Sequence, residues 1–171
     1  MKFLRVIVAA FAISAQLPSS AQTLWKDSVY GMTEAEVLKV NPSAVKTKKG
    51  SSLPNGAVQT LEVQNIEIVK RKFTAEFYFK DKKLNQITLS LNKGSDTLDA
   101  SSKWDELYLA LSAKYGKELS KKSQDGILKQ KLAEWAAGKT NIQLLFLAVG
   151  EKDPILQIAY HQGITQDAEK L

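Results

Sequence analysis

Alternation of apolar and polar residues marks three consecutive segments in the first half of the chain. In residues 73–79 the odd positions are apolar, and residues 87–91 alternate in the same way. Residues 58–69 alternate too, but the apolar positions shift parity near Gln64 and Asn65, which predicts a β-bulge there. Because the connections between these segments are short, we expect the strands to form an antiparallel meander.

A helical spacing replaces the alternation in the next element. Apolar residues recur at i, i+3, i+4, i+7 and i+11, as Trp104, Leu107, Tyr108, Leu111 and Tyr115. This spacing places them along one face of an amphipathic helix. We expect a serine at position 101 or 102 to cap the beginning of this helix, and a glycine at position 116 to end it.

A capping box predicts a shorter helix earlier in the chain. The Thr33 hydroxyl can accept from the Glu36 backbone N–H, while the Glu36 carboxylate can accept from the Thr33 backbone N–H. Pro42 is expected to end this helix within about two turns. The polar residues 46–56 that follow are rich in Lys, Ser and Gly, which indicates a loop.

Three more strands are predicted in the second half, at residues 127–136, 141–149 and 155–160, after a charged loop at residues 117–126. The middle strand is apolar on both faces over residues 142–149, so we place it centrally and largely buried in the sheet.

These elements together predict an α+β fold in the order αβββαβββ. An antiparallel sheet of about six strands would pack two helices on one face. The order is compatible with a structural repeat, with halves at residues 22–93 and 94–162 that form one sheet or two small units. A frayed tail would follow at residues 163–171.

The first 21 residues are typical of a secretory signal peptide. The only charges in residues 1–21 are those of Lys2 and Arg5, and an apolar run and small residues follow them. We expect cleavage after Ala21, so that the mature chain is a single domain at residues 22–171 beginning with Gln22. The apolar run is shorter than the roughly 20 residues that span a bilayer, and we expect no transmembrane segment.

Composition then narrows the classes of function. The 171-residue chain has no cysteine and one histidine, which excludes disulfides, thiol chemistry, cysteine-bound metals and a lipid anchor on cysteine. Removal of Lys2 and Arg5 lowers the formal charge from +6 to +4. This positive charge is too small to indicate nucleic-acid binding, and we expect no nucleic-acid partner. The expected location is the bacterial periplasm or the extracellular medium. A domain of this size can bury enough apolar surface to fold there without disulfides.

No motif assembles a catalytic, metal or cofactor site. His161 has no identifiable partner and is interpreted as a strand-end histidine. Nucleophile-elbow and phosphate-loop motifs are absent from the sequence. Carboxylates that meet only in space would still allow a hydrolase. The sequence favours a non-catalytic protein, with no cofactor and no metal.

Tryptophans supply the candidate binding residues. Trp104 belongs to the apolar helix face, but Trp25 and Trp135 are less constrained, and either would be an anchor for a partner if exposed. The basic and aromatic residues 70–80 are interpreted as a core strand rather than a surface that stacks on bases, because their phenylalanines share one face.

A short motif carries a family resemblance. Gly31-Met32-Thr33-x-x-Glu36-Val37 resembles the helix start of SmpA/OmlA-type outer-membrane assembly lipoproteins and of β-lactamase-inhibitor-like domains. The resemblance implies a small exported α+β module that binds proteins. The chain departs from the lipoprotein pattern, because it has no cysteine and has Val40-Asn41-Pro42 where that family has L-G-x-P. Its helix, strands and leader also look like those of uncharacterised bacterial exported proteins.

The leading hypothesis is therefore an exported binding module whose partner is another protein of the cell envelope. The alternatives are a hydrolase with a dispersed carboxylate site and a protein inhibitor that presents an exposed sheet face. The oligomeric state is left open.

Overall fold

The computed structural model describes residues 22–151 and 153–163. The predicted signal peptide and residues 164–171 of the predicted tail lie outside the described residues. The elements in chain order are β1 (Thr23–Trp25), β2 (Ser28–Val29), α1 (Glu34–Val40), β3 (Val45–Lys46), β4 (Val58–Ile68), β5 (Arg71–Lys80), β6 (Lys83–Leu91), α2 (Thr97–Tyr115), β7 (Ser120–Gln124), β8 (Leu128–Ala137), β9 (Thr140–Val149) and β10 (Ile155–Gln162).

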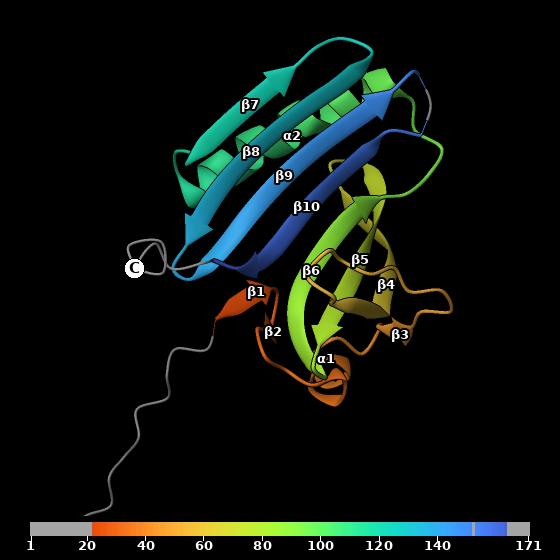
Figure 1. Cartoon of the computed structure of the whole chain (residues 1–171), viewed down its shortest axis with the longest axis vertical. Coiled ribbons are helices and arrows are strands. Elements are labelled where there is room, and N and C mark those ends of the chain that lie inside the picture. Colours follow the sequence, from red (N-terminus) through yellow and green to blue (C-terminus); the bar gives the residue numbers. More distant parts are fainter. Residues whose placement is uncertain (1–21, 152, 164–171) are drawn as a thin grey trace, which may run out of the picture.

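Eight of these strands form one antiparallel sheet in the order β3-β4-β5-β6-β10-β9-β8-β7. The order is symmetric about the β6–β10 pair, which joins the last strand of each half of the chain. The helix α2 packs on β8, β9 and β10, and it lies behind β8 and β9 in Figure 1. The strands β1 and β2 form a separate two-stranded sheet.

The predicted α+β fold with about six strands in the order αβββαβββ is wrong. The structure is mostly sheet, with 51% of the described residues in strands and 18% in helices. The prediction missed β7 because its residues are charged or polar and nearly all exposed at the edge of the sheet, so no alternation marks it. The strands β1, β2 and β3 are only two or three residues long, too short to produce a periodic pattern.

The predicted local features of the first half are confirmed. The pairing of β4 with β5 shifts between Val63 and Ile66, which marks the bulge, and Asn65 there has a φ of 58°. The capping box at α1 forms, with both the Thr33 and the Glu36 hydrogen bonds present.

The helix α2 begins earlier than predicted. Its N-cap is Asp96, whose carboxylate accepts the Asp99 backbone N–H at 2.7 Å, so the predicted serine caps are wrong. Arg71 of β5 donates to Asp99 through Nε at 2.8 Å and through a second nitrogen, which ties the first turn of α2 to the other half of the sheet. The predicted end at Gly116 is confirmed, where φ is 84°.

The core lies between α2 and one face of the sheet. Trp104, Leu107 and Leu111 are buried, while Tyr108 and Tyr115 pack against the core at its margin, so the predicted helix face is confirmed. The sheet contributes large side chains that are fully buried, among them Phe73, Phe77, Phe146, Leu144, Ile87, Leu156 and Trp135. Val37 of α1 belongs to the same core. Neither helix of the described part has the length and apolar character needed to span a bilayer.

The strand β9 is internal, as predicted, but only one of its faces is buried. Ile142, Leu144, Phe146 and Ala148 are buried beneath α2, whereas the residues between them are half-buried. Among the described residues, no helix therefore lies over the apolar side chains on the second face of β9.

We predict that Trp135→Ala lowers the free energy of unfolding by about 3–5 kcal/mol, because it empties a fully buried site beside Tyr108 and removes the hydrogen bond from Nε1 to the Gly116 carbonyl. Urea unfolding followed by circular dichroism measures the change. The control is Leu98→Ala on α2. Because this side chain is 82% exposed, its removal should change the free energy of unfolding by no more than about 0.5 kcal/mol. Equal losses for the two variants would contradict this assignment of the core.

Candidate functional site

The sheet face opposite α2, here called the open face, is not covered by either helix of the described residues. Its residues follow from the register, because Trp135 pairs with Ile142 beneath α2 and the neighbouring pair, Glu134 with Gln143, points away from the helix. In Figure 1 the open face of β8, β9 and β10 is turned toward the reader. It contains a polar network over β4, β5 and β6 and an aliphatic area over β8, β9 and β10.

The polar network centres on Glu76 in the middle of β5. Its Oε2 accepts hydrogen bonds from the Tyr78 hydroxyl at 3.1 Å and from the Ser90 hydroxyl of β6 at 3.0 Å. The loop before β4 folds over this end of the open face, where the Ser51 hydroxyl lies 2.9 Å from that of Tyr78. Gln59 donates to Glu62 at 3.3 Å and completes the network.

Burial changes the acidity of these groups. Burial raises the pKa of Glu76 above its ordinary value; the Ser90 and Tyr78 hydroxyls oppose this effect and the Glu62 charge adds to it. Burial also raises the pKa of Tyr78 to about 12. A cavity of about 310 Å³ lies over Glu76, Tyr78, Ser90 and residues of the loops beside them.

Within the described residues, Glu76 forms no ion pair with a lysine or arginine. It can therefore hold a proton or accept a hydrogen bond from a donor that enters the cavity. A hydrolase with a dispersed carboxylate site stays a prediction; it requires two carboxylates that meet in space, and Glu76 is the one acid of this cavity whose pKa is raised.

The aliphatic area, here called the aliphatic patch, consists of side chains paired across neighbouring strands. The pairs are Leu128 with Val149, Leu132 with Leu145, and Leu147 with Ile155. Val149 is 68% exposed and Ile155 is 48% exposed, so the patch is open to water at one end. Aliphatic side chains gathered on one face of a sheet are what a second layer normally covers.

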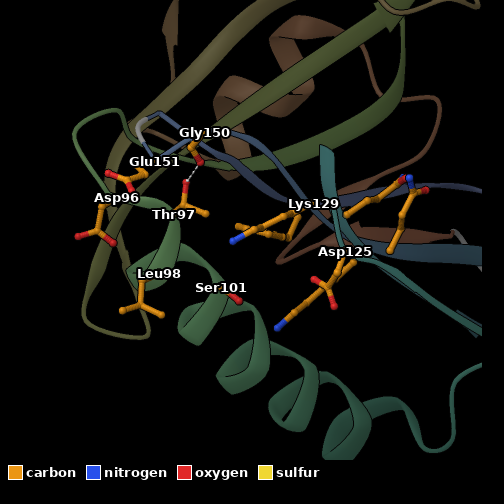
Figure 2. Close-up of a pocket in the computed structure, with 12 residues that line it drawn as sticks. Asp96, Thr97, Leu98, Ser101, Asp125, Lys129, Gly150 and Glu151 are labelled. Atoms are coloured by element: carbon orange, nitrogen blue, oxygen red, sulfur yellow. Dashed lines mark hydrogen bonds between the residues drawn. The ribbon is translucent and has the colours of Figure 1, made fainter. Parts of the chain in front are cut away.

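A second surface feature is a cleft at the beginning of α2, shown in Figure 2. It has a volume of about 500 Å³ and lies between α2, the β7–β8 turn and the β9–β10 loop. Asp96 and Glu151 lie on one side, and Lys129 and Asp125 lie on the other, while Thr97 donates to the Gly150 carbonyl at 2.9 Å. Three carboxylates and two lysines line this cleft, and the carboxylate of Asp96 already caps the helix. The cleft therefore favours neither an anion nor a cation.

The structure separates the two candidate tryptophans. Trp135 is fully buried, with its ring tilted by 48° against that of Tyr108, so it has no exposed surface to offer a partner. Trp25 is half-buried, with its ring edge-to-face with Phe77 at 6.3 Å between centroids. The remaining single candidate, His161, lies near the end of β10, with Nδ1 3.0 Å from the Gln162 carbonyl oxygen. Among the residues that the structure describes, no group of three His, Asp or Glu side chains is arranged to hold a metal ion.

Two features of the open face were not predicted from the sequence. The alternation in β5 places Glu76 and Tyr78 on the face away from the phenylalanines, so a signal for the network was present. The apolar run over residues 142–149 also signalled the aliphatic patch, but it was interpreted as a strand buried on both faces. What the sequence could not show is that α2 covers one face only.

We predict that Glu76→Gln changes how stability depends on pH. A carboxyl group whose pKa is raised by folding binds its proton more tightly in the folded chain, so the wild type loses stability as pH rises above about 4.5 and through the folded pKa. The variant has no carboxyl group at this position and therefore does not lose stability in this way as pH rises. The free energy of unfolding of the variant, relative to the wild type, should therefore increase between pH 4 and pH 7.

Urea unfolding at several pH values measures this difference. The control is Asp81→Asn in the exposed β5–β6 turn, where Asn tolerates the φ of 50°. Parallel pH dependences for wild type and Glu76→Gln would contradict the assigned burial of this carboxyl group.

Comparison with known proteins identifies a family for the chain but assigns no activity to it. No curated protein and no solved structure matches the chain. The sequence model of one protein family matches residues 25–168, which is most of the chain and includes both candidate tryptophans, the network and the patch. The chain therefore belongs to that family, which is described only as an uncharacterised protein.

Proposed function

We propose that this protein is a non-catalytic binding module, exported to the bacterial periplasm or cell envelope, that contacts another protein through its open face. The observation that carries the proposal is the aliphatic patch. Exposed aliphatic side chains that adjoin one another on a sheet mark surfaces that a partner covers, because burying them removes apolar area from water.

The surroundings of the patch support a protein as the partner. Glu134 of β8 accepts hydrogen bonds from the Ser120 hydroxyl at 2.7 Å and from the Gln143 amide at 3.0 Å, which lower its pKa and keep it ionised beside the patch. The aliphatic patch thus has polar groups at its margin, and an apolar area with a polar rim is the usual composition of a protein interface. Because the side chains project from paired strands, their positions are fixed before any contact is made.

Export is supported by the leader sequence. We predict that the protein recovered from the producing cell begins at Gln22 and is found outside the cytoplasm. The change Ala21→Leu should cause the precursor to accumulate, because cleavage requires small residues at this site. Ala10→Leu within the apolar run is the control and should be processed normally. Intact mass spectrometry reads out cleavage, and a wild-type mass that includes residues 1–21 would contradict the prediction.

Binding through the open face is tested by site-specific crosslinking in the producing cell. The photo-crosslinking amino acid p-benzoylphenylalanine replaces Val149 or Ile155 on the open face, or Leu98 or Leu109 on the exposed side of α2. We expect a defined product of higher mass from the two open-face positions only. Mass spectrometry of the product distinguishes a second copy of this chain from a different protein.

A second variant ties the product to the patch. Leu147→Asp should reduce crosslinking from Val149, because the charge makes burial of the patch unfavourable. Thermal unfolding checks that the variant is folded. Equal products from α2 and the open face, or none from the open face, would overturn the proposal.

A further inference from the structure

A second recess, separate from the open face, lies around Trp25 and is here called the Trp25 cleft. It has a volume of about 700 Å³ and lies where β1, the last turn of α2, the β8–β9 turn and β10 meet. Figure 1 shows β1 beside the end of β10. Its lining includes three aromatic residues and three lysines, namely Trp25, Tyr115, Tyr160, Lys26, Lys114 and Lys139.

The walls of the cleft are aromatic and held in place. Trp25 packs edge-to-face on the buried Phe77, which fixes the plane of its ring. Tyr160 is buried, and burial raises its pKa above the ordinary value. The Thr140 hydroxyl donates to the Thr23 carbonyl at 3.0 Å, and Gln22 donates to the Lys139 carbonyl, so β1 is attached to the β8–β9 turn.

The charge of the cleft has one sign. Its lining includes three lysines and no carboxylate from the described residues, and none of these lysines forms an ion pair there. Two of the ammonium groups lie over ring faces instead, Lys26 at 4.5 Å from the Trp25 centroid and Lys114 at 5.0 Å from the Tyr115 centroid.

The end of α2 does not cancel this positive charge. Helix C-termini are partly negative, but Lys114 lies in the last turn and the Gly116 carbonyl accepts from Trp135 Nε1 at 3.2 Å. The C-cap carbonyl is thus satisfied by the protein, and the exposed residues Lys26 and Lys139 lie at the rim of the cleft.

We infer that the Trp25 cleft binds a small anion that carries a flat ring, of the aromatic carboxylate class. The ring would lie against Trp25 and Tyr115, and the carboxylate would pair with the rim lysines. The volume is within the range of roughly 300–1,000 Å³ typical of small-molecule sites. Because the cleft and the open face share none of the residues used here, this inference is independent of the proposed protein partner.

The test is a titration of the ¹⁵N-labelled full chain with benzoate, followed by NMR. Saturable shifts are expected at the amides of residues 23–26, 114–116 and 138–140. Acetate has the charge without the ring, and benzyl alcohol has the ring without the charge. Each should bind at least about tenfold more weakly than benzoate, since both contributions are needed.

Variants assign the contacts. Lys26→Gln and Lys139→Gln should each weaken benzoate binding about threefold, as expected for charges at a rim, and Trp25→Leu should abolish saturation. The matched control is Lys129→Gln in the cleft of Figure 2, which should leave binding unchanged. Equal binding of acetate or inorganic phosphate would show an adventitious ion only. That result, or shifts confined to other regions, would overturn the inference.

Discussion

Hydrogen bonds between β6 and β10 join the two halves of the chain, and the rest of the structure depends on this pair. Leu89 lies opposite Ile158, and Ile87 lies opposite Tyr160, so the apolar faces of both halves turn to the same side of the sheet. A slip of one residue would turn one half over relative to the other. The single core beneath α2 and the continuous open face both follow from this register.

The two faces of the sheet have different roles because only one of them is covered. Beneath α2, apolar side chains from both halves form one core, and Arg71 of β5 holds the beginning of the helix through Asp99. On the open face the halves differ, with a hydrogen-bonded network around Glu76 in the first and the aliphatic patch in the second. The half-buried Glu76 is held by the Tyr78 and Ser90 hydroxyls, and it lies on the other half of the sheet from the exposed apolar side chains.

Much of the local structure could be predicted from the sequence, because it depends on neighbouring residues. The capping box at Thr33, the bulge at Asn65 and the apolar face of α2 are set within a few positions of one another. The number of strands could not be predicted, because β7 is held by pairing with β8 and carries no apolar pattern of its own. The burial of Trp135 and the exposure of the aliphatic patch depend on where α2 lies, which local spacing does not determine.

The polar character of β7 has a further consequence for the molecule. This strand is the last of the sheet, so one row of its backbone N–H and carbonyl groups has no partner strand. Free edges of this kind invite other chains to add strands, and the nearby aliphatic patch would strengthen such an association. Lys121 and Lys122 place charges along this edge, and the ammonium group of Lys121 is held 3.8 Å from the Tyr108 ring centroid. The same charged residues that leave β7 without an apolar pattern thus disfavour the addition of further strands at this edge, and so oppose aggregation.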